Sequence, residues 1–271
     1  MRKFFIQCLV LISMIGFQVQ ADTNTDLNVL KASGEDFNYP NYFRIKEDPR
    51  FQFFNLLAMD EVSEKFPLPT VPYNRAAQFG GWLADVSGAT CMNTRAFVLV
   101  RDSATQVTMT PNGCTVKSGT WNDPYTAAQL VSANDIQIDH VVALKNAYMT
   151  GAHEWNQAKR CLYANYMGNK FHLLSVDGPQ NLKKSDLSPA GYTPPNKKFV
   201  CEFIKDWLNI KLIWSLRVTP TENDAIQSIA VDNNCDPAKF VVTAASLQEQ
   251  RKFMADNANL CTAPGLAIVP F

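Results

Sequence analysis

One stretch of this sequence, residues 135–188, constrains the fold more than any other. A short β-branched run at Ile138–Val142 predicts one strand, and His172–Val176 predicts a second. A Gly-Pro turn at residues 178–179 then leads into a short polar helix that carries Asn181. Strand, loop, strand and helix in this order predict a compact ββα unit.

The same stretch holds residue types that suit catalysis by a base and a cation. Asp139 and His140 lie at the end of the first predicted strand, and the ββα unit brings Asn181 to the same end. Carboxylate and amide oxygens are the ligands that a hard divalent cation prefers. An imidazole with an ordinary pKa of about 6.5 suits a general base at neutral pH.

An ordered series of short motifs resembles the HNH (His-Me finger) nucleases, most closely their secreted bacterial branch. The resemblance covers roughly residues 73–218. The motifs are Tyr73-Asn74-Arg75, Cys91-Met92-Asn93-Thr94-Arg95, Ser118-Gly119, Asp123-Pro124-Tyr125-Thr126, Asp139-His140-Val141-Val142-Ala143-Leu144, Tyr163-Ala164-Asn165, Leu173–Asn181, Lys184, Asp186 and Pro194-Pro195. The sequence departs from the family pattern at one position, because His172 stands where the pattern has its middle Asn.

This resemblance implies an α+β fold with a ββα-metal nuclease core at about residues 136–188, inside an HNH-like domain at residues 73–218. A small β-rich subdomain stapled by a disulfide is expected before the core, with helices after it. The implied activity is hydrolysis of DNA phosphodiester bonds with little sequence specificity. His140 would act as the general base, and Asp139 and Asn181 would hold one divalent cation.

The remaining site residues follow from the same resemblance. His172 would orient the base through a backbone hydrogen bond, or bind metal or phosphate, and Asn169 lies close enough in sequence to take its place. The candidate substrate-binding residues are Lys183, Lys184 and Arg95, with a structural salt bridge as an equal alternative for Arg95.

Mg²⁺ is the expected cofactor, because it keeps most of its waters and needs few protein ligands. Mn²⁺ stays open as an alternative, and Zn²⁺ is less favoured. DNA is the expected partner, and both RNA as a second substrate and a protein inhibitor stay open. We expect the protein to act as a monomer.

The first 21 residues are typical of a secretory signal. Arg2 and Lys3 precede the apolar run Phe4–Phe17, and Val19-Gln20-Ala21 forms a small-residue cleavage site. That run is short for a bilayer, and no later run qualifies as a span. We therefore expect cleavage after Ala21 and a secreted or periplasmic protein without a membrane anchor.

The cysteines agree with export, because six of them follow the signal and an even number predicts three disulfides. Their connectivity stays open from sequence. The simplest arrangement joins sequence neighbours, namely Cys91 with Cys114, Cys161 with Cys201, and Cys235 with Cys261.

The charge distribution favours an anionic partner at the predicted site, although the net charge of the chain is zero. Residues 139–217 hold 11 Lys and Arg against 6 Asp and Glu, a local excess of +5. Residues 22–138 carry −4 and residues 218–271 carry −3. Positive charge near the site is what a phosphate backbone requires, with a solvated surface of chance composition as the alternative.

The rest of the chain gives weaker signals. Residues 22–72 form an N-terminal extension, and residues 219–271 a helical C-terminal wrap. The expected further elements are a helix at Phe51–Lys65, strands at Ala96–Arg101, Gln106–Thr110 and Cys114–Ser118, and a helix from Asn196 to Leu216.

Two functions of other kinds compete with the nuclease. His172 in place of Asn favours a catalytically inactive module that binds nucleic acid on a nuclease scaffold. A zinc hydrolase would use the three histidines, but the sequence has no His-Glu-x-x-His motif.

Overall fold

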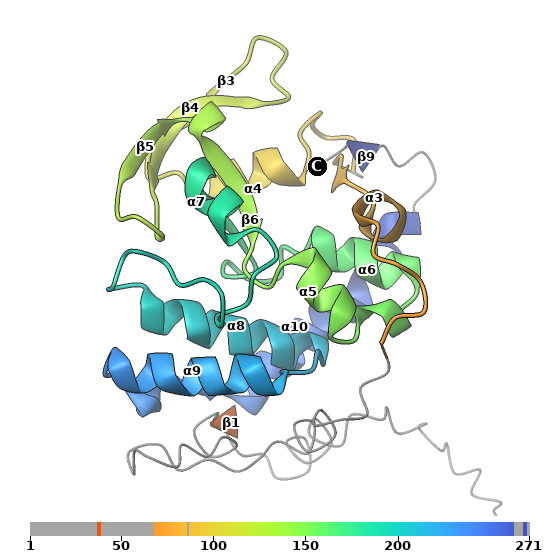
Figure 1. Cartoon of the computed structure of the whole chain (residues 1–271). Helices are drawn as coiled ribbons and strands as arrows, with labels where there is room; N and C mark the ends of the chain where they lie inside the picture. The colour runs from red at the N-terminus through yellow and green to blue at the C-terminus, as the bar shows by residue number, and fades with distance from the viewer. Residues whose placement is uncertain (1–36, 39–67, 86, 263–267, 270–271) are drawn as a thin grey trace, which may run out of the picture.

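The computed structural model describes residues 37–38, 68–85, 87–262 and 268–269 (Figure 1). The expected signal with its cleavage site after Ala21, and the expected helix Phe51–Lys65, lie outside these residues. Within them the protein is a mixed α+β fold, as predicted. In Figure 1 a β-rich part stands at one end and long helices at the other, with the ββα unit between them.

The elements follow one another as short strands and mostly short helices. The α-helices described are α3 (Arg75–Phe79), α4 (Thr94–Asp102), α5 (Leu144–Met149), α6 (Gln157–Ala164), α7 (Gly178–Lys184), α8 (Val200–Trp214), α9 (Pro220–Asp232) and α10 (Ala244–Asp256). The strands are β1 (Phe37–Asn38), β2 (Trp82–Leu83), β3 (Thr108–Met109), β4 (Val116–Asn122), β5 (Gln129–Ser132), β6 (Ile136–His140), β7 (Leu173–Asp177), β8 (Val241–Val242) and β9 (Ile268–Val269). Single 3₁₀ turns are η2 (Ala133–Asp135), η3 (Ala152–Glu154), η4 (Pro237–Lys239) and η5 (Leu260–Thr262).

The predicted ββα unit is confirmed. Strands β6 and β7 pair antiparallel, with Ile136 opposite Asp177 at one end and His140 opposite Leu173 at the other. Helix α7 starts where β7 ends, because the Asp177 side chain accepts a hydrogen bond from the Gln180 amide at 2.9 Å and caps the helix. The tight connection fixes α7 against the two strands.

Both faces of the β6–β7 ribbon are packed. Side chains alternate between the faces of a strand, so Ile136 and Ile138 point to one side together. They join a small hydrophobic cluster with Trp121 and the strand β4. Val176 belongs to a second, larger cluster built around α8. The ribbon therefore lies between two cores, which holds its Asp139–His140 end in a fixed position.

The β-rich part before the core differs from prediction in one element. Strands β3, β4 and β5 form an antiparallel sheet in that order, but the strand predicted at Ala96–Arg101 is wrong, because these residues lie in α4. The Asn93 side chain accepts from the Ala96 amide at 3.0 Å and starts the helix. Val98 and Leu99 suggested a strand, yet they are buried as one side of an amphipathic helix.

The disulfide prediction was right for one of the three bonds. The bonds are Cys91–Cys114, Cys161–Cys261 and Cys201–Cys235. The first staples the β-rich part, as expected. The other two predicted pairings are wrong, because α6 meets the turn η5 from 100 residues further along the chain. Sequence neighbours are not neighbours in space here.

The helices after the core match their predicted positions closely. Helix α8 begins at Val200 rather than at Asn196, whose side chain instead accepts from the Lys198 amide at 3.2 Å in a preceding turn. Helix α9 starts with a capping box in which Thr219 and Glu222 satisfy each other's backbone amides. Among the described residues, no helix has both the length and the apolar character that a membrane crossing requires.

Candidate active site

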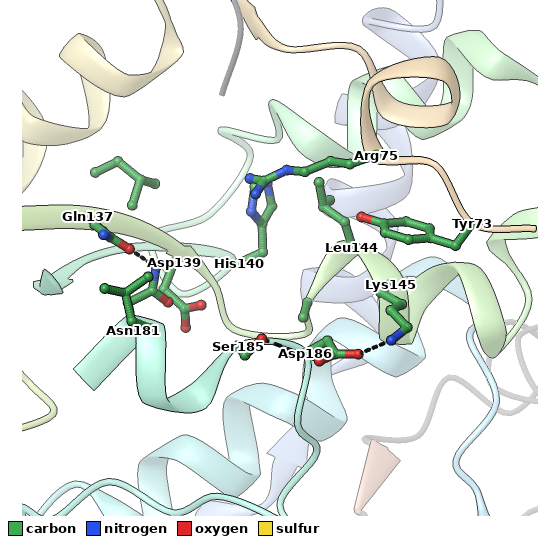
Figure 2. A pocket seen from close by; sticks show the side chains of 13 residues that line it. Tyr73, Arg75, Gln137, Asp139, His140, Leu144, Lys145, Asn181, Ser185 and Asp186 are labelled. Carbon is green, nitrogen blue, oxygen red and sulfur yellow. Dashed lines mark hydrogen bonds and ion pairs between the residues drawn. The ribbon is translucent and has the colours of Figure 1, made fainter. Parts of the chain in front are cut away.

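A pocket of about 360 Å³ opens at the end of β6, between α3, α5 and α7 (Figure 2). It is lined by three of the predicted site residues, His140, Asp139 and Asn181. The sequence order alone separates Asn181 from the other two, and the ββα unit brings them together. The three residues that the sequence predicted to meet therefore line one pocket.

The contacts of the His140 ring include a hydrogen bond and a stacked indole, besides an edge-on contact with the ring of His172. Its Nε2 lies 2.9 Å from the carbonyl oxygen of Ala164 at the end of α6. Its ring also stacks on the indole of Trp82, with 5.5 Å between centroids and 3° between planes. A hydrogen bond and a parallel ring together fix both the rotation and the plane of the imidazole.

These contacts also define the protonation of His140. A carbonyl oxygen only accepts hydrogen bonds, so Nε2 carries the proton and Nδ1 carries the lone pair in the neutral ring. Burial holds the pKa of His140 well below its ordinary value. The Ala164 hydrogen bond opposes this shift, and the charges near the ring, Arg75 among them, add to it. The imidazole is therefore neutral at physiological pH and able to take up a proton.

Asp139 is buried and accepts two hydrogen bonds. Its Oδ1 accepts from the Lys184 ammonium at 2.7 Å, and its Oδ2 accepts from the Tyr125 hydroxyl at 2.5 Å. Burial raises the pKa of Asp139, and both partners oppose that rise by stabilising the carboxylate. Lys184 also donates to the backbone oxygen of His140 at 3.0 Å.

The spacing of α7 explains these contacts. Residues three apart on a helix share a face, so Asn181 and Lys184 both meet β6. Asn181 donates its amide nitrogen to Gln137 Oε1 at 2.8 Å, while Lys184 reaches Asp139. Gln137 and Asp139 are two apart and therefore lie on the same face of their strand. Two residues on one face of α7 therefore each bind one residue on the facing side of β6.

The structure corrects the predicted role of Lys184. The side chain is fully buried, with its ammonium committed to Asp139 and to a backbone carbonyl. It is therefore a structural counter-charge rather than a phosphate contact. Lys183, its neighbour on α7, is exposed but is not among the residues that line the pocket.

Arg95 and Asn169 take structural positions as well. Arg95 Nη2 donates to the carbonyls of Ala133 and Ile136 at 3.0 and 2.8 Å, which braces the start of β6 outside the pocket lining. Asn169 accepts from the backbone amide of His172 at 2.8 Å and donates to Gln250. It shapes the loop before β7 and does not reach the pocket.

His172 lies beside the site rather than in it. Its Nε2 is 2.8 Å from the Tyr163 carbonyl, one residue before the carbonyl that holds His140. Its backbone oxygen accepts from the Val141 amide at 3.2 Å, directly after the end of β6. The ring itself is buried among aromatic side chains and does not line the pocket. A direct contact of this ring with metal or phosphate is not supported.

Sequence reasoning did not assign the charged residues Arg75, Lys145 and Asp186 to the site, although they line the pocket. Arg75, from α3, reaches toward the His140 imidazole in Figure 2. Lys145 and Asp186 form an ion pair of 2.6 Å at the rim. Arg75 stands in the Tyr-Asn-Arg motif of the resemblance, which was the available signal. Asp186 also stands among the motifs of the resemblance, whereas no motif includes its partner Lys145.

The oxygen atoms present fit a hard divalent cation. A carboxylate offers about four lone-pair positions, and the two hydrogen bonds to Asp139 occupy one on each oxygen. Asn181 has committed its amide nitrogen to Gln137, which leaves the amide oxygen as its ligating atom. The described residues contain no group of three His, Cys, Asp or Glu side chains suited to a metal, so the zinc hydrolase gains no support.

Comparisons with known proteins place this chain among nuclease-related proteins. Residues 100–229 match the family described as the C-terminal domain of GmrSD restriction endonucleases. An uncharacterised secreted protein of Arthroderma benhamiae is 35% identical over 158 residues, which is 58% of this chain and 74% of the fungal protein. No solved structure matches the chain. The family match contains the ββα unit and most of the pocket lining, but not Tyr73 and Arg75. The second match covers most of the fungal protein.

Proposed function

The chain belongs to one family with the secreted fungal protein, and part of it matches a nuclease-related domain. We propose that it is an exported, metal-dependent endonuclease of the HNH type. It hydrolyses phosphodiester bonds of DNA with little sequence specificity. The observation that carries this proposal is the neutral, doubly held imidazole of His140 in a pocket that it shares with Asp139 and Asn181.

His140 acts as the general base in this proposal. Its Nδ1 takes a proton from a water molecule, and the oxygen of that water attacks the phosphorus. The bond from phosphorus to the leaving 3′ oxygen breaks, and that oxygen takes up a proton from a second water molecule. The products are a 5′ phosphate and a 3′ hydroxyl. The Ala164 carbonyl steadies the imidazolium that forms, because it accepts from Nε2 in both protonation states.

Asp139 and Asn181 hold the divalent cation through their oxygen atoms, with Mg²⁺ or Mn²⁺ as the metal. When bound, it supplies Lewis-acid stabilisation of the phosphate and the leaving oxygen. Tyr125 and Lys184 keep the Asp139 carboxylate ionised and oriented. Oxygen ligands favour these metals over Zn²⁺, which prefers nitrogen and sulfur.

Arg75 extends the proposal to the substrate. A guanidinium binds two phosphate oxygens at once in a planar arrangement. Arg75 lines the pocket on the side of His140, and Asp139 and Asn181 line it on the side of α7. A phosphate held between these sides faces the base. No separate module for reading base sequence is present in the described part of the chain, which agrees with low specificity.

Export is the second part of the proposal. Three disulfides form in the described residues, and such bonds persist in oxidising compartments. The fungal relative is named a secreted protein. We place cleavage of the signal after Ala21, with release to the periplasm or the medium.

The test is plasmid cleavage by the oxidised mature protein in Mg²⁺ or Mn²⁺, beside an EDTA control and a His140→Ala variant. His153→Ala is the matched control, because the His153 ring also contacts a backbone carbonyl, that of Tyr148, but lies outside the pocket lining. We expect cleavage by the wild type and by His153→Ala alone.

Two outcomes would overturn this proposal. Cleavage that survives in His140→Ala would remove the base from this pocket. Retention of DNA on a gel by folded protein, without any cleavage in either metal, would favour the inactive nucleic-acid-binding module.

A further inference from the structure

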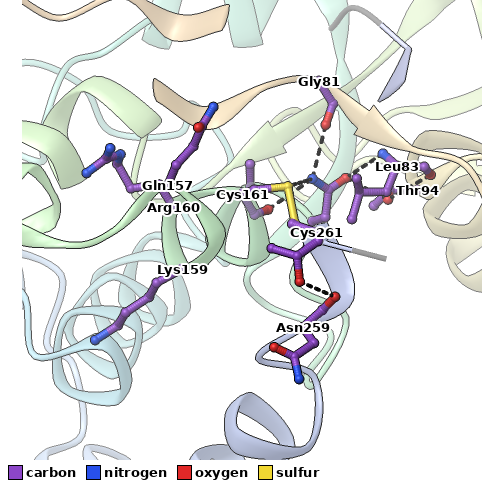
Figure 3. Close-up of a disulfide and its surroundings, with 12 residues drawn as sticks. Gly81, Leu83, Thr94, Gln157, Lys159, Arg160, Cys161, Asn259 and Cys261 are labelled. Carbon is purple, nitrogen blue, oxygen red and sulfur yellow. Dashed lines mark hydrogen bonds between the residues drawn. A yellow bond between two sulfur atoms is a disulfide. The ribbon is translucent and has the colours of Figure 1, made fainter. Parts of the chain in front are cut away.

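Asn165, directly after α6, ties two distant segments of the chain together. The side chain is buried, and its amide makes four hydrogen bonds. Its Oδ1 accepts from the Leu83 amide at 3.0 Å and the Thr94 hydroxyl at 2.7 Å. Its Nδ2 donates to the carbonyls of Gly81 and Cys161, each at 3.0 Å. Figure 3 shows these bonds beside the disulfide of α6.

This amide is used to its full capacity. An asparagine side chain offers two donor hydrogens and two acceptor positions, and all four are matched here. Aspartate would lose both donors, and alanine would leave buried backbone groups of β2 without partners. The joint between β2 and the end of α6 therefore depends on this residue type.

The two joined segments are the ones that hold His140. Gly81, just before β2, and Leu83, within it, lie on either side of Trp82, whose indole stacks on the imidazole. The residue before Asn165 is Ala164, whose carbonyl faces Nε2 of His140. Asn165 is not among the residues that line the pocket. It instead joins the segment of the Trp82 indole to the segment of the Ala164 carbonyl, and these two groups orient His140.

We propose that Asn165 is a positioning residue for the general base, which acts by locking Trp82 and the Ala164 carbonyl into one rigid mount for the His140 ring. The inference rests on the proposed function, in which His140 takes a proton from water. Without the amide, β2 separates from α6 and the imidazole gains rotational freedom. The base then spends less time aimed at the attacking water.

The experiment uses the oxidised mature protein and a DNA duplex oligonucleotide with Mg²⁺. Asn165→Ala is expected to lower kcat by about 10-fold to 100-fold, since small misplacements of reacting groups cost about this much. KM stays at the wild-type value, because no substrate contact changes. In NMR spectra the His140 ring protons lose the shift that the stacked indole imposes on them.

Asn156→Ala is the matched control at the other end of the same helix. The Asn156 side chain accepts from the Lys159 amide at 2.8 Å and makes no contact with β2. This variant lowers the melting temperature by weakening α6, while kcat and the His140 ring-proton shifts remain those of the wild type. Equal kcat values for Asn165→Ala and Asn156→Ala would overturn the inference.

A second pair of variants covers the case in which Asn165→Ala fails to fold. Trp82→Phe keeps a flat ring over the imidazole and Trp82→Leu does not, so kcat is expected to be higher for the phenylalanine. Equal kcat values for the two variants would contradict the proposal that the Trp82 ring positions His140. Failure of the inference is separable from failure of the function. An inactive His140→Ala beside a fully active Asn165→Ala contradicts only the inference, while an active His140→Ala contradicts the proposed base.

Discussion

The two sides of the α6 C-terminus hold two histidines in nearly the same way. His140 and His172 are both buried, and their Nε2 atoms lie 2.9 and 2.8 Å from the adjacent carbonyls of Ala164 and Tyr163. The pocket side opens on Asp139 and Asn181. The opposite side closes into a cage of rings, in which His172 meets Tyr163, Tyr166 and Trp214.

The difference lies in access, because both rings are anchored but His140 lines the pocket and His172 does not. Burial lowers the pKa of both rings, and that of His172 falls to about 3. In the described structure Nδ1 of His172 is buried without a protein hydrogen-bond partner, and the ring does not line the pocket. The departure from the family pattern at this position is therefore accommodated in the core, and it gives no physical reason for an inactive site.

The largest expected effect separates the two histidines by activity. His140→Ala lowers kcat for DNA cleavage by about 10²-fold to 10⁴-fold, the usual contribution of a general base. His172→Phe keeps an aromatic ring in the cage and retains kcat within about threefold, since the pocket lining is unchanged. Steady-state cleavage of one duplex by both purified variants measures this. Loss of cleavage in a folded His172→Phe would place the second histidine in the mechanism.

The next effect concerns the two lysines at the end of α7. Lys184→Met leaves the Asp139 carboxylate buried beside an apolar group and lowers the free energy of unfolding by about 3–5 kcal/mol. Lys183→Met, on the exposed face of the same turn, changes it by about 0.5 kcal/mol or less. Urea unfolding of both variants gives the comparison. Similar losses would mean that the ion pair is not what holds Asp139.

The sequence was sufficient to predict the pocket side, and insufficient for the cage side. Asp139, His140 and Asn181 belong to one local strand–strand–helix unit. Its hydrophobic periodicity and its Gly-Pro turn are visible in the sequence, and they predict that the three residues meet. The contacts of His172 and of the cysteines join segments far apart in the chain, and nothing local encodes them. Lys184 was misjudged for a related reason, because an isolated sequence does not show that a helix face is buried.

A pH experiment tests what the two histidines share. The unfolded chain binds a proton on each imidazole below about pH 6.5, whereas the folded chain leaves His172 neutral down to a pKa of about 3. The contribution of the neutral His172 to the free energy of unfolding is therefore fully present above pH 6.5, and it is lost as the pH falls toward 3. Each histidine that burial keeps neutral lowers the free energy of unfolding by about 1.4 kcal/mol for every pH unit of acidification in that window.

The variant His172→Phe removes the acid-induced loss of unfolding free energy that His172 causes. Between pH 6 and pH 4 its unfolding free energy should fall less steeply than that of the wild type, by about 1.4 kcal/mol per pH unit. Chemical unfolding at several pH values measures the slope. An unchanged slope would show that His172 is protonated in the folded protein, and that burial does not hold it neutral.

The smallest expected effect lies at the rim of the pocket, where Lys145 and Asp186 form an ion pair as short as that of Lys184 and Asp139. The distances are 2.6 and 2.7 Å, but the rim side chains are 51% and 39% exposed while the inner ones are 0% and 4% exposed. Water already solvates the rim charges, so the pair contributes between about 0 and 1 kcal/mol. Lys145→Met should therefore cost less than about 1 kcal/mol in urea unfolding, and salt should reduce the wild-type contribution further. A loss as large as that of Lys184→Met would mean that distance, rather than burial, sets the strength of both ion pairs. It would contradict the distinction between a solvated pair at the pocket rim and a buried pair beside His140.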